Sequence, residues 1–408
     1  MGDKRYYLYL ESFVFAFKHG NKCLLYDSFL GKSFVIEVGG ELESVLSELL
    51  DEKNMYSILL LEKRIEDEYV SDFIKTVKDN FLGDLVDTDL VSVKPVVFPP
   101  ILDFQKKKAN QELELNVLDN LKELVFYVNG FCEGGNCSEK CDLYFKQCLF
   151  CKKSNVNSYL EFGDLKRFLE MYPVSHFPIY IVGGNLNRYS YIDQLIDFLS
   201  VFENVNYCIH YKHYWMQIEK WKDLPCVILV DCDFDHSLLC SIFEFVVPLE
   251  KHPRFVFLVN DLKKFSSALF FQKEYMEENI SVIPIFDDNF SFFEENIFVT
   301  QSDLENIKLK KKDIYRNKVL NSNLFGRLII DNDGKIYTNV NDVSLGNIVD
   351  ETLKSSVMKA LKGNNSWFRI RTMSPCSECL YQWLCPPPSN YDYVMRRFNL
   401  CRLKGGAL

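Results

Sequence analysis

Short apolar segments alternate with amphipathic segments through the middle of the chain. The amphipathic segments, such as 164–172 and 191–202, carry apolar residues at helical spacing. Segments that are apolar at nearly every position are typical of strands buried on both faces, and their alternation with helices is typical of parallel βα units. The predicted strands are 123–130, 177–184, 204–211, 225–232, 254–261 and 280–287.

Polar residues stand at the carboxyl ends of most of these predicted strands. In barrel-like α/β folds the carboxyl edge of the sheet forms the mouth of the active site. The same polarity also arises wherever a strand leaves the core, so no single residue is assigned a role from this pattern. The residues are Asn129, His210, Asp231, Asn260 and Asp287.

The first 90 or so residues have a different pattern. Three β-rich runs between residues 12 and 38 are separated by turns at Gly20 and Gly31, and helical patterns follow at 41–51 and 67–82. The segment 94–112 carries three prolines and a lysine run, which indicates a linker. We therefore expect a small α+β unit over residues 1–93 and a linker over 94–115.

A third pattern begins near residue 324. The segment 326–340 predicts a β-hairpin with Asp333-Gly334 in its turn, and 345–363 predicts a helix closed by Gly363. A cysteine-rich tail follows. We therefore expect two further units, over 116–318 and 319–408.

Composition and charge narrow the class of protein. The chain has 408 residues, of which 48% are apolar, and a net charge of −10, which argues against broad binding to nucleic-acid phosphates. Charged residues interrupt the N-terminal segment, so neither a signal peptide nor a membrane span is predicted, and a cytoplasmic location is expected. In a reducing compartment, fourteen cysteines favour buried thiols or metal ligands over disulfides.

Four of these cysteines lie in the tail, at Cys376, Cys379, Cys385 and Cys401. The spacing is C-x2-C-x5-C with a late fourth cysteine. Four thiolates suit either a [4Fe–4S] cluster or a four-cysteine zinc site. A zinc ribbon normally has two C-x2-C pairs and this tail has one, so iron–sulfur is favoured, with zinc and plain buried thiols as the alternatives.

The other group of four is Cys137, Cys141, Cys148 and Cys151, in the segment CSEKCDLYFKQCLFC. Radical S-adenosylmethionine (SAM) enzymes carry C-x3-C-x2-C after the first barrel strand, and SAM chelates the cluster iron that the three thiolates leave open. This segment follows the first predicted strand but contains two overlapping, incomplete copies of that motif. Both copies fail at Tyr144, which stands where each requires a cysteine.

The turn after the second predicted strand also departs from the radical SAM pattern. Radical SAM enzymes usually have Gly-Gly-Glu there, whereas this chain has Gly183, Gly184 and Asn185. A neutral amide cannot pair with the ammonium group of SAM as a carboxylate can. The turn is therefore predicted to be a degenerate SAM-binding turn.

The tail adds the most specific part of a family resemblance. DNDGKIYTN, LGNIVDETL and CSECLYQWLC occur in the order of a SPASM domain, and the four tail cysteines match the ligands of its second auxiliary [4Fe–4S] cluster. Ser389 and Asn339 stand where ligands of the first auxiliary cluster are expected. Over most of its length the chain resembles the pseudo-radical-SAM proteins of the GG-Bacteroidales ribosomal peptide (RiPP) systems, which are similar to radical SAM/SPASM peptide maturases.

The resemblance implies an α/β fold with a partial (β/α)6 radical-SAM-like barrel, an N-terminal winged-helix-like module and a C-terminal SPASM-like domain. It implies a pseudoenzyme with one C-terminal [4Fe–4S] cluster, which binds a precursor peptide, an active radical SAM maturase, or both. The N-terminal module would be a peptide recognition element, which binds a leader as an added strand. Its expected edge is 31–38, with Lys32, Phe34 and Ile36 as the contact residues.

Two alternative functions remain open at this point. One is an active radical SAM/SPASM enzyme with an atypical cluster loop over 137–151, which would bind and cleave SAM, since a longer loop costs little closure entropy. The other is a zinc-stabilised peptide-binding scaffold. Four cysteines in the 137–151 loop could also cap all four irons of a cluster and leave SAM no open site.

Overall fold

The structure is a computed structural model that describes residues 4–91, 93–97, 117–131, 139–151, 158–170, 177–249, 252–275 and 277–403. The chain is an α/β protein built around a mostly parallel sheet of nine strands, with two smaller antiparallel sheets in its N-terminal part. Most of the predicted linker lies outside the described residues. Among the helices of the described part, none combines the length and the apolar character needed to cross a bilayer.

The six predicted strands of the middle segment are confirmed, and they lie side by side in sequence order. Each pairs in parallel with its neighbour, and the register continues from one strand to the next. The strands are β7 (Glu123–Asn129), β8 (Ile179–Gly183), β9 (Val205–His210), β10 (Cys226–Val230), β11 (Arg254–Val259) and β12 (Ile280–Pro284).

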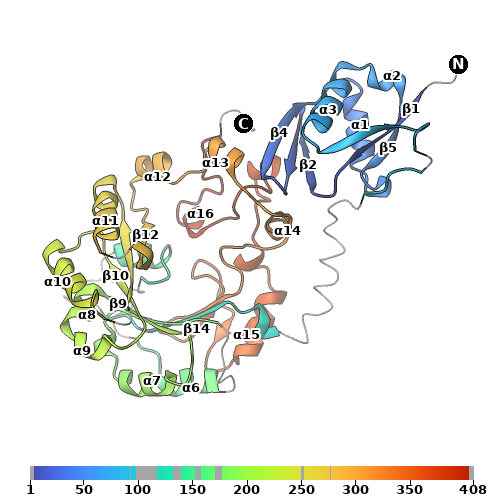
Figure 1. The fold of residues 1–408 in the computed structure, drawn as a ribbon. Helices are drawn as coiled ribbons and strands as arrows, with labels where there is room; N and C mark the ends of the chain where they lie inside the picture. Colours follow the sequence, from blue (N-terminus) through green and yellow to red (C-terminus); the bar gives the residue numbers. More distant parts are fainter. Residues whose placement is uncertain are drawn as a thin grey trace.

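Helices cover the outer face of this sheet (Figure 1). Along β7, Leu124, Phe126 and Val128 point toward these helices, whereas Val125 and Tyr127 point to the inner face, as the period of two in a strand requires. Both faces are therefore buried, which explains the continuous apolar runs. The covering helices are α6 (Phe162–Glu170), α7 (Ile192–Leu199), α8 (Tyr211–Met216), α9 (Ile218–Trp221), α10 (His236–Val246) and α11 (Leu262–Glu274).

The predicted hairpin over 326–340 is also confirmed, and it extends the same sheet. Strand β13 (Arg327–Ile330) pairs in parallel with β7 and antiparallel with β14 (Lys335–Tyr337), and Gly334 takes a positive φ in the turn between them. A short strand, β15 (Gly346–Asn347), pairs with β14. The sheet order is β12-β11-β10-β9-β8-β7-β13-β14-β15.

The helix predicted over 345–363 is wrong in its first part. Helix α15 begins at Leu353 and ends at Lys362, because Thr352 accepts a hydrogen bond from the backbone N–H of Ser355 and caps it. Residues before Thr352 belong to β15 and the turn after it. Leu345 and Ile348 are apolar because both pack on the main core, not because they belong to a helix. Their spacing therefore extended the helical pattern past the true start of α15.

The N-terminal part contains the three expected strands and three that the sequence pattern did not predict. The expected ones, β2 (Val14–His19), β3 (Lys22–Asp27) and β4 (Lys32–Glu37), form one antiparallel sheet in which β4 is an edge strand. A second sheet has the order β5-β1-β6, which departs from a simple winged-helix arrangement. Its strands and the helices of this part are β1 (Arg5–Leu10), β5 (Ser57–Leu61), β6 (Gly83–Asp87), α1 (Leu42–Leu49), α2 (Glu62–Ile65) and α3 (Glu68–Asp79).

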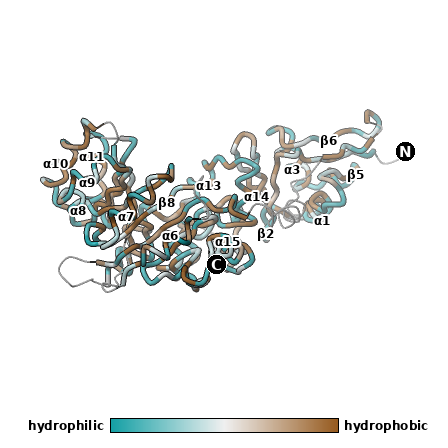
Figure 2. Tube along the Cα trace, turned by 90° about the horizontal axis from the view of Figure 1, so that it is seen from below, coloured by the Kyte–Doolittle hydropathy of each residue, from teal (hydrophilic) through white to brown (hydrophobic). Residues whose placement is uncertain are grey.

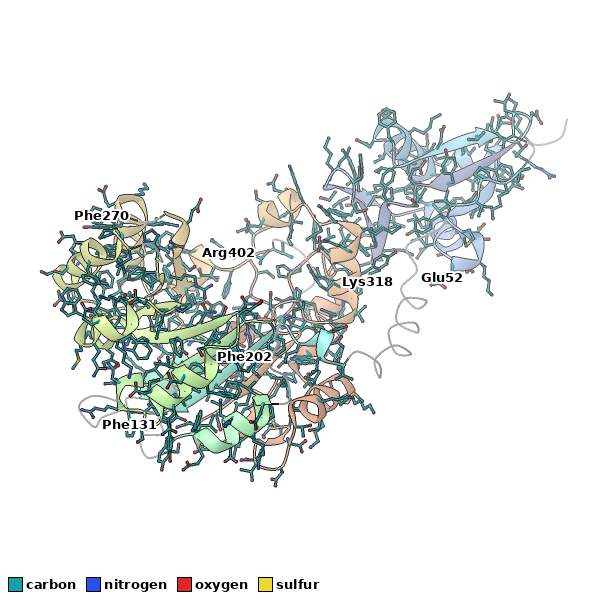
Figure 3. All side chains as sticks on the ribbon, turned by 60° about the horizontal axis from the view of Figure 1, so that its bottom comes forward. Glu52, Phe131, Phe202, Phe270, Lys318 and Arg402 are labelled. Atoms are coloured by element: carbon teal, nitrogen blue, oxygen red, sulfur yellow. The ribbon has the colours of Figure 1, made fainter. Side chains whose placement is uncertain are left out.

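The sheet β2-β3-β4 rests on the C-terminal part of the chain (Figures 1 and 2). Tyr26 on β3 donates its hydroxyl to the carbonyl of Leu309, at 3.0 Å, and accepts the N–H of the same residue. The ammonium of Lys318 lies 5.2 Å from the ring centre of Phe17, and Figure 3 shows this lysine at the junction between the two parts. Burial lowers the pKa of Lys318 below its ordinary value.

The remaining helices are distributed along the whole chain. The α-helices are α5 (Glu139–Phe145), α12 (Phe290–Asn296), α13 (Gln301–Asn306), α14 (Lys311–Val319) and α16 (Asn390–Val394). The 3-10 helices are Glu52–Asn54, Val117–Asn120, Leu186–Arg188, Glu277–Asn279, Ser366–Phe368 and Cys376–Glu378.

Candidate functional site

The polar residues predicted at the strand ends do gather at the carboxyl edge of the parallel sheet, in two bonded pairs. Nε2 of His210 lies 3.0 Å from Oδ2 of Asp231, and Nδ2 of Asn260 donates to Oδ2 of Asp287 at 2.7 Å. Burial alone would raise the pKa of Asp231, but the hydrogen bond and charge of His210, with the more distant charges of two lysines, outweigh it and lower that pKa. Asp231 is therefore ionised at neutral pH.

The described part of the cysteine loop fills the inner face of the sheet at this edge. Cys137 lies outside the described residues, and Cys141 is half-buried on α5. After α5 the chain turns inward, and Cys148 and Cys151 are only 2% and 5% exposed. They pack in one apolar cluster with Phe145 and with inward-facing strand residues such as Val125, Val182, Val227 and Val256.

Tyr144 joins this loop to the strand ends. Its hydroxyl donates to Oδ2 of Asp287 at 3.2 Å and lies within electrostatic range of Cys232, which directly follows Asp231. Burial, together with Cys232 and Asp287, raises the pKa of Tyr144 far above its ordinary value. The residue that breaks both copies of the three-cysteine motif is therefore a neutral phenol that closes the mouth of the sheet.

A glutamine amide fastens the same loop to the end of β12. Nε2 of Gln147 donates to the carbonyl of Phe286 at 2.8 Å, and Oε1 of Gln147 accepts the N–H of Phe286 at 2.8 Å. The hydroxyl of Tyr127 donates to the carbonyl of Leu149 on the opposite side. These bonds satisfy polar groups that the apolar surroundings would otherwise leave unpaired.

Cys148 and Cys151 influence each other's ionisation. The interaction with Cys148 and burial keep the pKa of Cys151 well above its ordinary value, whereas the interaction with Cys151, backbone hydrogen bonds and the charge of Arg327 lower the pKa of Cys148. Both thiols are buried in the apolar cluster on the inner face of the sheet.

The Gly183–Asn185 turn is packed against the chain that follows β7. A side chain at Gly184 would place its Cβ 1.8 Å from the carbonyl oxygen of Phe131, so only glycine fits there. Its N–H donates to Oδ1 of Asn129 at 3.0 Å. The oxygen of the buried Asn185 side chain accepts the N–H of Asn187 and caps the next 3-10 helix. Both features have a structural explanation within the turn itself.

The four tail cysteines are within electrostatic range of one another. Cys376, Cys379 and Cys385 each feel the charge of Cys401, and Cys379 and Cys385 also feel that of Cys376. Burial is the main reason that the pKa of each of these three is raised, to about 12 for Cys385. Among the described residues, no group of three or more His, Cys, Asp and Glu side chains is already drawn together as a metal site.

A buried arginine organises this cysteine segment, and the sequence pattern did not single it out. Arg371, 8% exposed, pairs with Oδ1 of Asp392, 1% exposed, at 3.0 Å. Its Nε donates to the carbonyl of Pro386, next to Cys385, at 2.7 Å. Its Nη1 also donates at 2.6 Å to the carbonyl of Phe398, which accepts the thiol of Cys376 as well.

The donor chemistry of the tail fits a four-thiolate metal site with a compensating charge. Four half-buried thiols would carry excess negative charge when a metal is bound, and the guanidinium of Arg371 lies within electrostatic range of Cys385 and Cys376. A buried cation stabilises such an anionic centre. In the cysteine loop inside the sheet, the charge of Arg327 acts on Cys148 in the same sense.

Asn339 and Ser389, the positions that lack the expected cysteines, carry hydrogen bonds instead. Nδ2 of Asn339 donates to Oδ1 of Asn390 at 2.8 Å. Ser389 caps α16, and its hydroxyl donates to Oδ2 of Asp392 at 2.9 Å. Both side chains therefore stabilise the start of α16.

A groove of about 520 Å³ lies along the edge of β4. Of the three predicted peptide-contact residues, Lys32 and Phe34 line this groove, whereas Ile36 is buried in the N-terminal core. Val35, which is 47% exposed, also lines the groove, although the sequence analysis did not name it as a contact residue. The groove is lined by Lys22, Lys32, Ser33, Phe34, Val35, Gln301, Glu305, Cys379, Leu380, Tyr381 and Leu403.

No protein-family model and no curated protein matches this chain. Among solved structures, a crystal structure of Streptococcus suis SuiB bound to S-adenosylmethionine aligns with 99% of this chain and 100% of the SuiB chain. The two sequences are 12% identical, and the TM-score is 0.41. A TM-score of this size does not establish a common fold.

Proposed function

We propose that this chain is a non-catalytic member of a peptide-maturation system, and that it binds a precursor peptide, an active radical SAM maturase, or both. The observation that carries the proposal is the packing of the cysteine loop. Tyr144, Cys148 and Cys151 occupy the inner face and the mouth of the parallel sheet, where a radical SAM enzyme needs its cluster and SAM.

Two features argue together against SAM chemistry at this edge of the sheet. Tyr144 is a neutral phenol and supplies no thiolate. The Asn185 side chain is committed to a cap, so a carboxylate for the SAM ammonium is missing at that position. Separate changes at two places in the chain, the cysteine loop and the turn after β8, support the loss of SAM chemistry better than an unusual version of it.

The tail is proposed to hold one metal centre through Cys376, Cys379, Cys385 and Cys401, a [4Fe–4S] cluster, with zinc as the alternative. Bound metal would supply cross-links that hold the tail folded, and four thiolates would leave SAM no open coordination position. Arg371 positions the backbone on either side of these cysteines. This role is structural and requires no turnover.

The groove beside β4 is the proposed peptide site. An edge strand presents unpaired backbone groups that an extended peptide can complete, and side chains on the groove face then discriminate among peptides. Val35 and Leu380 offer apolar contacts, and Lys22 and Lys32 offer positive charge.

The experiment that tests the proposal titrates the anaerobically prepared full chain with two ligands in separate cells of a calorimeter. The first is the synthetic leader half of a short precursor peptide, which the proposal expects to be encoded beside this chain's gene, and the second is SAM. We expect saturable binding of the peptide and no binding of SAM. Tight SAM binding without peptide binding would contradict the proposal.

A further inference from the structure

The far wall of the β4 groove is built from the cysteine tail itself. Cys379, Leu380 and Tyr381 face β4 across the groove, and Leu403 lies two residues after Cys401. The same short segments thus carry two of the four proposed metal ligands and the surface that a peptide on β4 would meet.

Hydrogen bonds connect the ligand-bearing segments to the rest of the groove. Cys379 closes a 3-10 turn by donating its N–H to the carbonyl of Cys376 at 3.1 Å, and Tyr381 accepts the N–H of Leu384 at 3.0 Å. Cys401 forms a parallel β-bridge with Val299, just before α13, whose Gln301 and Glu305 line the groove. A displacement of either cysteine segment therefore moves a wall of the groove.

The wall is also packed against the sheet that carries β4. Tyr381 and Leu384 share one apolar cluster with Leu24 and Tyr26 of β3, the strand paired with β4. Leu24 lies opposite Val35 in that pairing. The width of the groove is thus set by contacts between the cysteine tail and the neighbouring strand.

We propose that metal binding by the four tail cysteines and peptide binding in the β4 groove are linked, so that each increases the affinity for the other. The inference rests on the proposed function, since it takes this groove as the peptide site. Metal ligation would fix the Cys379–Tyr381 wall in advance and spare the peptide the entropy of ordering it. Linkage is reciprocal, so bound peptide must slow the loss of metal by the same coupling.

The occupant is an extended peptide segment with an apolar residue flanked by a carboxylate. The apolar residue would meet Val35 and Leu380, and the carboxylate would meet Lys22 or Lys32 near the two ends of the strand pair. Glu305 on the opposite side disfavours a second carboxylate in the middle of the groove. The backbone of the segment would pair with the outer edge of β4.

The test measures the Kd of a fluorescein-labelled synthetic peptide, extended and with an apolar residue flanked by a carboxylate, for the full chain in two states. One state is loaded anaerobically with iron and sulfide, or with zinc, and the other is stripped with a chelator under reducing conditions. We expect the Kd to be roughly tenfold lower in the loaded state. In the reverse direction, saturating peptide should slow metal transfer to a chromophoric chelator.

Matched variants locate the effect. Val35→Asp and Leu380→Asp should weaken peptide binding in both states, whereas Val201→Asp and Leu262→Asp, at exposed sites outside the groove, should not. Equal Kd values in the loaded and stripped states would overturn the linkage and leave the proposed function standing. Absence of peptide binding in both states would overturn the proposed function and the linkage with it.

Discussion

The hydroxyl of Tyr144 donates to the Oδ2 atom of Asp287 at 3.2 Å, and this bond closes the carboxyl edge of the parallel sheet. Asp287 also accepts Nδ2 of Asn260, so one carboxylate connects the cysteine loop to the ends of two strands. Tyr144, which stands at a cysteine position of the three-cysteine motif, therefore holds the loop against the ends of these strands.

Removing the Tyr144 hydroxyl should weaken the fold. Tyr144→Phe leaves the ring in place but removes the hydrogen-bond donor to Asp287, and it should lower the free energy of unfolding by about 1 kcal/mol. Urea unfolding followed by circular dichroism measures this value. The control is Tyr159→Phe, at a partly exposed ring, which should change stability by less than about 0.5 kcal/mol.

Tyr144→Cys should restore metal binding to the loop, because it completes the C-x3-C-x2-C spacing that begins at Cys137 and Cys141. After anaerobic reconstitution we expect about four more irons per chain than in the unchanged protein. Tyr144→Ser removes the same ring without adding a thiol and should bind no additional iron. An iron content identical in both variants would show that Tyr144 is not what keeps a cluster out.

Arg371→Gln should destabilise the tail strongly. The substitution leaves Asp392 buried without its cation and removes hydrogen bonds to the carbonyls of Pro386 and Phe398. Breaking one partner of a buried pair costs about 3–5 kcal/mol, which guanidinium unfolding of the metal-free chain measures. Arg371→Lys should recover only part of the loss, since an ammonium lacks the planar fork of the guanidinium.

The matched control for Arg371→Gln is Arg316→Gln. Arg316 pairs with Asp313, one turn earlier on the same helix, and this pair is more exposed than the Arg371–Asp392 pair. That substitution should cost below about 1 kcal/mol. A comparable loss at both arginines would contradict the role of Arg371 as the organiser of the cysteine segment.

The His210–Asp231 pair predicts a dependence of stability on acidity. Because the pKa of Asp231 is lowered in the folded chain, its contribution is present above the pKa of an unfolded aspartate, near 4, and is lost as the pH falls through the folded value. The metal-free chain should therefore lose more stability than Asp231→Asn between pH 6 and pH 3. The difference should stay below about 1 kcal/mol, since the pair is partly exposed. Parallel profiles for the two proteins would contradict the lowered pKa of Asp231.

Local pattern was sufficient for the elements whose burial is uniform. Strands β7 to β11 are buried at most positions on both faces and appear as continuous apolar runs, and the hairpin at Gly334 has an explicit turn signal. Strands β1, β5 and β6 were missed because they pair across long sequence separations, as Arg5 does with Leu61, and no turn motif connects them. The start of α15 was missed because Leu345 and Ile348 are buried without being helical.

In the candidate site, too, some features were visible in the sequence and others were visible only in the fold. The sequence pointed to Tyr144 and Asn185 as departures from a motif, but it could not show that Tyr144 bonds to Asp287, 143 residues away. Gln147 and Arg371 gave no signal, since each acts on backbone carbonyls that only the fold brings near. The residues lining the far wall of the β4 groove were likewise identifiable only after β4 and the tail had been placed side by side.

The central claim is that the chain has lost SAM chemistry and keeps one metal centre in its tail. Its most direct test is anaerobic reconstitution of the full chain with iron and sulfide, followed by iron analysis and by addition of SAM and a reductant. We predict about four irons per chain and no 5′-deoxyadenosine. About eight irons per chain with formation of 5′-deoxyadenosine would contradict the claim.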